Sequence, residues 1–259
     1  VGAHYDRYDV FLIQGEGRRQ WQIGQTCSEN SPLMAHDQLS LLDQFEMVEE
    51  FVLNPGDMLY IPPLVAHKGV AVSDACVTYS VGFRSPSHAE VLTTFADECG
   101  MNISADLRLQ DHGFTAKSGE LSAADIEGLM TFMRDQITPE NVAQWFGKHS
   151  TEPKHTNLDM AEEAMDLIEL ESIINDGYGV LRVSEGVRLA HTWQGDGGLT
   201  LFVQGDALPC PPEAAAFVEA ISNRWLLEVD EMTELVKNDA AKAMLLILHN
   251  QGYLFFADE

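Results

Sequence analysis

The sequence places two histidines and a carboxylate where they could bind one metal ion. His4 and Asp6 are separated by one residue, so on an extended strand both side chains project from the same face. His67 follows a turn and a short apolar run that ends in two prolines. A metal held by two imidazoles and one carboxylate keeps coordination positions open for small molecules. We therefore expect His4, Asp6 and His67 to be ligands of a catalytic metal.

The segment that ends at His67 carries a recognisable pattern of glycine, proline and histidine. Its sequence is Gly-Asp-Met-Leu-Tyr-Ile-Pro-Pro-Leu-Val-Ala-His over residues 56–67. This run resembles the second conserved motif of the cupin superfamily, in which Gly56, Pro62 and His67 match in register. Leu64 stands where that family has glycine. An aspartate in the His-x-Asp triplet, instead of a second histidine, favours the ligand set of Fe(II) oxygenases over that of isomerase or storage cupins.

Two further segments extend the resemblance. The runs Tyr8–Trp21 and Tyr79–Pro86 are similar to the bacterial JmjC-type ribosomal oxygenases, in the branch that hydroxylates a ribosomal protein arginine. In that family a basic residue lies fifteen positions after the first histidine, which here is Arg19, and it binds the distal carboxylate of 2-oxoglutarate. Strand alternation allows only one of Arg18 and Arg19 to face inward, without choosing between them.

The resemblance implies a complete reaction. Fe(II) would bind to the three ligands, 2-oxoglutarate and dioxygen would be cosubstrates, and the product would be an arginine of large-subunit ribosomal protein sixteen hydroxylated at its β-carbon. Thr78 and Ser80, which share one strand face, would hydrogen-bond the cosubstrate. Near the mouth of the site, candidates for contacts with the substrate guanidinium are Tyr5, Asp9 and Ser85.

Two other classes of function remain open from the residues alone. One is a non-oxidative metal cupin, such as a sugar isomerase, which would turn over without oxygen or 2-oxoglutarate. The other is a non-enzymatic, metal-free barrel that binds a peptide. Metal content and succinate release distinguish the three.

The strongly negative net charge of the chain indicates which macromolecules it could bind. The 259 residues include 41 acidic and 15 basic side chains, for a formal net charge of −26. Such a surface repels phosphate backbones, so we expect no direct nucleic-acid partner and favour a basic ribosomal protein. No apolar stretch approaches the roughly 20 residues of a membrane span, and the four cysteines are scattered as in free, buried thiols. We expect a cytoplasmic protein.

Residues 1–88 have the pattern of β-structure. Strand-like runs at Tyr8–Gln14 and Arg18–Ile23 flank Gly15-Glu16-Gly17, which predicts a hairpin turn. About five or six strands are predicted, whereas a double-sheet jelly roll uses about eight. This count and the initial Val1 lead us to expect that N-terminal strands of a JmjC/cupin barrel are missing from the sequence.

Two further segments follow the double-stranded β-helix predicted for residues 1–88. We therefore expect an α+β protein. Residues 89–155 have helical periodicity, with a cap at Ser122, and we expect them to form a dimerisation segment of a homodimer. Residues 156–259 mix helices with strands such as Leu189–Trp193, which predicts a winged-helix-like domain. This last segment carries 19 acidic and 5 basic residues. Its negative charge argues against the binding of nucleic acid that is common among winged-helix folds.

Overall fold

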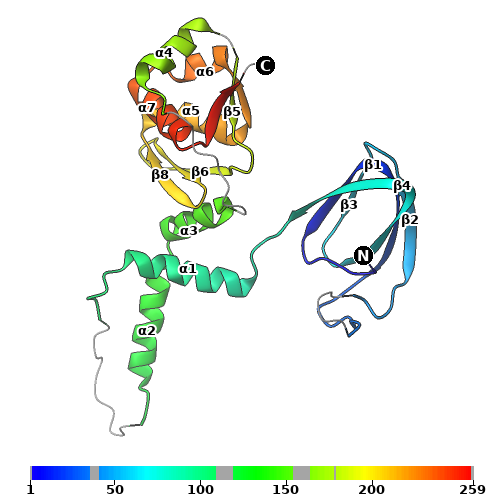
Figure 1. The fold of residues 1–259 in the computed structure, drawn as a ribbon. Helices are drawn as coiled ribbons and strands as arrows, with labels where there is room; N and C mark the ends of the chain where they lie inside the picture. Colours follow the sequence, from blue (N-terminus) through cyan, green and yellow to red (C-terminus); the bar gives the residue numbers. More distant parts are fainter. Residues whose placement is uncertain (1, 36–40, 109–118, 154–163, 178, 258–259) are drawn as a thin grey trace. The chain divides into compact units, whose positions relative to one another are not determined.

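The computed structural model describes residues 2–35, 41–108, 119–153, 164–177 and 179–257. The chain divides into two compact units, Val1–Val91 and Leu92–Glu259 (Figure 1). The predicted boundary at residues 155–156 lies outside the described residues, so the division into three segments stays a prediction. In the described part of the chain, no helix is long and apolar enough to cross a membrane.

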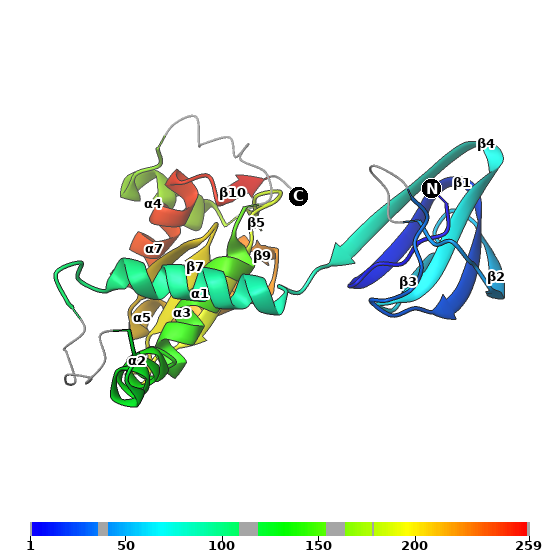
Figure 2. The ribbon, with the colours of Figure 1, turned by 90° about the horizontal axis from the view of Figure 1, so that it is seen from below.

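The first unit is a curled antiparallel sheet built on two long strands. Strand β1 (Asp9–Thr26) pairs along most of its length with β4 (Val65–Phe83). The other edge of β1 pairs with β3 (Met58–Ile61) near its start and with β2 (Met47–Leu53) near its end. Figure 2 shows these strands, in blue to cyan, curving round an interior. Side chains buried together there are Val10, Leu12, Trp21, Leu53 and Ile61.

The predicted hairpin at Gly15-Glu16-Gly17 is wrong, because β1 runs through this segment without reversing. The pairing with β4 instead shifts register between Gln14 and Glu16 and again between Gly17 and Arg19. Gly17 has φ 63°, and a Cβ there would collide with the carbonyl oxygen of Ala75. The glycines therefore permit a bulge, in which extra residues are absorbed inside one strand.

The second unit begins with helices. They are α1 (His88–Asn102), whose first residues belong to the first unit, α2 (Ala123–Asp135) and α3 (Pro139–Thr151). The Ser122 hydroxyl accepts a hydrogen bond from the backbone N–H of Asp125, which confirms the predicted cap of α2. Helix α3 packs against the strands that follow it in this unit.

The remainder of this unit alternates helices with two small antiparallel sheets, ordered β10-β5-β9 and β6-β7-β8. The predicted strand Leu189–Trp193 forms with those bounds. The elements are α4 (Leu167–Asp176), β5 (Val180–Val183), β6 (Leu189–Trp193), β7 (Leu199–Val203), β8 (Asp206–Cys210), α5 (Pro212–Asn223), β9 (Leu226–Glu228), α6 (Val229–Leu235), α7 (Asp239–Asn250) and β10 (Leu254–Ala257).

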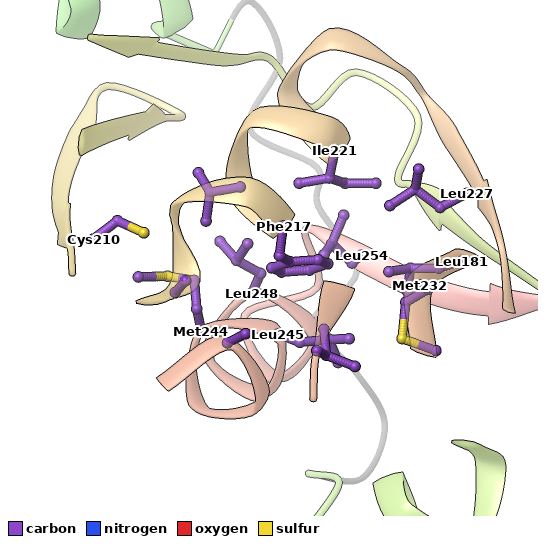
Figure 3. Close-up of a cluster of buried hydrophobic side chains, with 14 of the residues drawn as sticks. Leu181, Cys210, Phe217, Ile221, Leu227, Met232, Met244, Leu245, Leu248 and Leu254 are labelled. Atoms are coloured by element: carbon purple, nitrogen blue, oxygen red, sulfur yellow. The ribbon is translucent and has the colours of Figure 1, made fainter. Parts of the chain in front are cut away.

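One apolar core holds these elements together. Helices α5 and α7 pack on each other, and Phe217 and Leu245 lie fully buried between them and the strands (Figure 3). All four cysteines are free thiols, and three are buried, while Cys76 is half-buried. The prediction of free thiols is confirmed.

Candidate metal centre

The backbone holds His4 and His67 directly opposite each other. Their main chains form an antiparallel bridge, in which His4 N–H donates to the His67 carbonyl (3.1 Å) and His67 N–H donates to the His4 carbonyl (2.8 Å). The two imidazole rings lie 4.4 Å apart between centroids. Pairing of His67 with Ile23 on β1 continues the ladder on the other side of β4. Residues 63 positions apart in sequence therefore become cross-strand neighbours.

Both imidazoles have one nitrogen committed to the backbone. Nδ1 of His4 lies 2.8 Å from the Gly2 carbonyl oxygen, and Nδ1 of His67 lies 3.0 Å from the Val65 carbonyl oxygen. A carbonyl oxygen can only accept, so Nδ1 of each ring carries the proton. This fixes the tautomer that leaves the Nε2 lone pair available to a metal.

The carboxylate of Asp6 completes the cluster. One ligand atom from each of His4, Asp6 and His67 lies within 4.8 Å of the others, and Nε2 of His67 is 3.6 Å from Oδ2 of Asp6. His67 is 2% exposed, and burial is the main cause that lowers its pKa. A lowered pKa favours the neutral imidazole, which is the form that binds metals. Two imidazoles and a carboxylate fit a divalent ion such as Fe(II).

A cavity of about 740 Å³ opens beside this cluster. Tyr5 and Ser85 line it, and the Tyr5 hydroxyl donates to the Ser28 carbonyl (3.2 Å). Asp9 lies elsewhere, because its carboxylate accepts a hydrogen bond from Tyr60 (2.5 Å), whose ring stacks on Phe11. The structure thus brings two of the three substrate candidates to the cavity. Its lining includes His4, Tyr5, Asp6, Tyr8, Arg84 and Ser85.

Arg19 is the arginine of the tandem pair that turns toward the barrel interior. Its guanidinium carbon lies 5.6 Å from the ring centroid of the buried Trp21, whereas Arg18 is exposed. The Nε atom of Arg19 is buried and has no hydrogen-bond partner among the described residues. A buried donor without a partner is costly, so this atom fits a carboxylate that binds between the strands.

Thr78 and Ser80 lie on β4 opposite the inward-facing part of β1. Thr78 pairs with Gln14, and Ser80 pairs with Leu12. The Thr78 hydroxyl donates to the side-chain oxygen of Gln14 (2.8 Å), while Ser80 is exposed. Their role in cosubstrate binding stays a prediction.

Two residues near the site escaped the sequence analysis. Tyr8 lines the cavity, and its pKa is raised by burial, by the negative charge of Asp6 and by a hydrogen bond to that carboxylate. Its position two residues after Asp6 on an extended segment could have revealed it. Gln14 is buried inside the barrel, on the strand face that alternation assigns to Val10 and Leu12.

Comparison with known proteins places the chain in a family. The models of the JmjC domain and of the ROXA-like winged helix match residues 1–91 and 131–255. The chain is 32% identical over 266 residues to the ribosomal protein uL16 3-hydroxylase of Escherichia coli (strain K12), covering 99% of this chain and 67% of that protein. The chain belongs to the bacterial JmjC-type ribosomal oxygenases. The expected family and its α+β fold, a JmjC/cupin domain followed by a winged helix, are confirmed.

Solved structures agree with this assignment. The X-ray structure of E. coli ycfD superimposes on this ribosomal oxygenase with a TM-score of 0.84 at 30% identity, covering 99% of this chain and 68% of that one. A structure of E. coli YcfD in complex with cobalt and 2-oxoglutarate gives a TM-score of 0.79. A probable ribosomal oxygenase of Haemophilus influenzae is 29% identical over 80% of this chain. The chain spans 67% and 53% of the lengths of the E. coli and H. influenzae proteins.

Leu64, which stands where the cupin motif has glycine, has an unusual backbone conformation. Leu64 has φ 65°, in the left-handed region that favours glycine. Its N–H donates to the Asp6 carbonyl (2.7 Å) and its carbonyl accepts from Cys27 N–H (2.7 Å). These two bonds tie the loop before β4 to the segment that carries Asp6 and to Cys27, the residue that follows β1. The ribosomal oxygenase therefore keeps the turn that glycine would allow, at a cost in strain.

Replacement of Leu64 tests this strain. At most positions Gly is less stable than Ala by about 0.5–1 kcal/mol. Here the order should reverse, with Leu64→Gly more stable than Leu64→Ala by about 1 kcal/mol, because only Gly relieves the left-handed strain. Urea unfolding of both variants measures the difference, and Ala71→Gly on β4, the strand that begins after Leu64, should show the ordinary sign. A Leu64→Ala variant as stable as Leu64→Gly contradicts the prediction.

Proposed function

We propose that this ribosomal oxygenase is an Fe(II)- and 2-oxoglutarate-dependent hydroxylase that modifies the β-carbon of an arginine in ribosomal protein uL16. The observation that carries the proposal is the convergence of His4, Asp6 and His67, with ligand atoms within 4.8 Å of one another beside an open cavity. The name of the E. coli relative, a uL16 3-hydroxylase, supports the substrate, and its cobalt and 2-oxoglutarate complex supports the cofactors.

Each side chain of the site has a defined task in this proposal. Bound iron, with 2-oxoglutarate and dioxygen, supplies the oxidant for an unactivated C–H bond. His4, Asp6 and His67 would hold the metal, and a metal with three protein ligands would have coordination positions left for the cosubstrates. Tyr8 lines the same cavity as Asp6, and its hydroxyl is placed to orient that carboxylate. Arg19 binds the distal carboxylate of 2-oxoglutarate, and Thr78 and Ser80 lie on the neighbouring strand.

The proposed substrate is basic, and the chain is strongly acidic. A net charge of −26 attracts a cationic ribosomal protein over distances of about a Debye length and repels free nucleic acid. Tyr5 and Ser85 line the cavity and are placed to contact the substrate guanidinium. We further propose that the protein acts in the cytoplasm, where ribosomal proteins are made.

Substitution of His4 tests the metal centre. His4→Ala removes one of three ligands, so succinate release from 2-oxoglutarate in the presence of Fe(II) and a uL16 peptide should fall to the metal-free background. His191→Ala, which changes a histidine bonded to Ser222 in the other unit, should retain turnover.

The outcome separates the alternatives. Wild-type protein that binds metal without consuming 2-oxoglutarate would be a non-oxidative cupin, and protein that binds peptide without metal would be a binding barrel. Full activity of His4→Ala would show that the ligand assignment is wrong.

Substitution of Arg19 tests the cosubstrate anchor. Arg19→Ala should raise the KM for 2-oxoglutarate by about tenfold to a hundredfold, since a charge-assisted contact is lost, with a smaller change in kcat. Arg18→Ala removes the same charge from the exposed neighbour and should leave KM near that of the wild type. Steady-state kinetics at saturating peptide measure both. An equal effect of the two substitutions contradicts the assignment.

Helix α2 supports a homodimer. In the described part of the chain, none of its residues is buried, although its sequence is amphipathic. A helix that leaves an apolar stripe uncovered is typical of an interface. The stripe, at helical spacing, consists of Ile126 (47% exposed), Leu129 (41%), Met130 (37%) and Met133 (55%). We propose that a second copy of the chain covers it.

Charges placed in this stripe should break the dimer. Leu129→Glu combined with Met133→Glu would bury two carboxylates in the interface, so light scattering after size-exclusion chromatography should show a monomer where the wild type is a dimer. Thr131→Glu adds a charge at an exposed polar position of the same helix and should leave the dimer intact. A wild type that is monomeric at high concentration contradicts the proposal.

A further inference from the structure

Strand β1 changes the face that it turns to the barrel interior. In its first part the even-numbered side chains are inside, with Leu12 4% and Gln14 1% exposed against 36% for Ile13. In its second part Trp21, an odd-numbered residue, is 6% exposed and Arg19 shares its face. A strand of uniform register would keep the even positions inside, and Arg18 would then face the interior.

The change of face comes from one inserted residue. Gln14 pairs with Thr78 and Glu16 pairs with Val77, so Gly15 is an extra residue on β1 with no counterpart on β4. Because side chains alternate with a period of two, a one-residue insertion exchanges the two faces of everything that follows. The bulge therefore decides which arginine of the tandem pair enters the barrel.

The side chain of Gln14 holds this bulge together. Its Nε2 donates to the carbonyl of Glu16 (2.7 Å) and lies 3.3 Å from that of Gly17. Its Oε1 accepts the hydroxyl hydrogen of Thr78 (2.8 Å). A side-chain amide thus bonds two backbone carbonyls at the irregular point of the strand, where the ladder with β4 is broken.

The same amide also reaches the surroundings of Arg19. Nε2 of Gln14 lies 3.4 Å from the sulfur of Cys76. The hydrogen bond from Gln14 and a smaller effect of the Arg19 side chain lower the pKa of this thiol, so both side chains lie near it. Gln14 consequently holds both the strand before Arg19 and the side chain of Cys76, which pairs with Gly17 two residues before Arg19.

We propose that Gln14 is a positioning residue for the cosubstrate: by clamping the bulge of β1 it turns Arg19, and not Arg18, toward the distal carboxylate of 2-oxoglutarate. This inference rests on the proposed function. Gln14 touches neither metal nor cosubstrate in this account and acts through Arg19 alone. Its removal should therefore affect ligands that carry a distal carboxylate and spare those that lack one.

Anaerobic calorimetry on the Co(II)-loaded whole chain tests the proposal. Gln14→Met keeps the volume of the side chain and removes its hydrogen bonds. The variant should bind 2-oxoglutarate about tenfold or more weakly, while its affinities for Co(II) and for 2-oxobutyrate, a 2-oxo acid without the distal carboxylate, should match those of the wild type. Gln22→Met is the matched control, since Gln22 lies on the same strand and bonds Glu50 on the outer face (2.7 Å).

A double-mutant cycle adds a second readout. If Gln14 acts through Arg19, then Gln14→Met in an Arg19→Ala background should cause no further loss of 2-oxoglutarate affinity. Ser73→Ala loosens the bulge from the surface, because Oγ of Ser73 accepts from Arg18 N–H (2.7 Å) and donates to the Ala75 carbonyl (2.6 Å). This milder variant should show a smaller loss with the same selectivity, and it covers the case in which Gln14→Met does not fold.

The outcomes that overturn the proposal are separate from those that overturn the proposed function. Three outcomes would reject the role of Gln14 and leave the proposed function intact. They are wild-type affinity of Gln14→Met for 2-oxoglutarate, an equal loss of affinity for 2-oxobutyrate, and additivity of Gln14→Met with Arg19→Ala. Failure of the Co(II)-loaded wild type to bind 2-oxoglutarate at all rejects the proposed function and this inference with it.

Discussion

The antiparallel pairing of β1 with β4 is the constraint on which the site depends. Near one end of this ladder Ile23 pairs with His67. On the other side of β4, His67 forms a bridge with His4, so the N-terminal segment joins the sheet there. The ligand cluster is thus fixed by backbone hydrogen bonds, which hold the imidazoles before any metal binds. Such prior ordering means that little conformational entropy remains to be lost when the ion enters.

The same ladder governs the second part of the site through its irregularity. A regular pairing would bring Arg18 to the interior, and the inserted Gly15 reverses this. Backbone pairing therefore brings the proposed metal ligands together, and a bulge turns the proposed cation inward. Both devices serve the same end, because a metal and a guanidinium at fixed positions can bind the two ends of one dicarboxylate.

The residues of the candidate site differ in how far their positions could be predicted from the sequence. The convergence of His4, Asp6 and His67 was predictable because a one-residue spacing and a glycine-proline pattern are both local signals. The predicted hairpin at Gly15–Gly17 was wrong because two glycines permit a bulge as readily as a turn, and the pairing with β4, some 60 residues away, makes the choice. The choice between Arg18 and Arg19 depends on that same long-range pairing. Asp9 bonds Tyr60 away from the cavity for a similar reason, since its partner lies on another strand.

X-ray absorption spectroscopy of the Co(II)-loaded wild-type chain tests the central claim most directly. The account predicts one ion per chain, with the outer-shell scattering of two imidazoles and with oxygen neighbours that include one carboxylate. Binding of less than one equivalent, or a spectrum without two imidazoles, would contradict the convergence of these three side chains on a single metal.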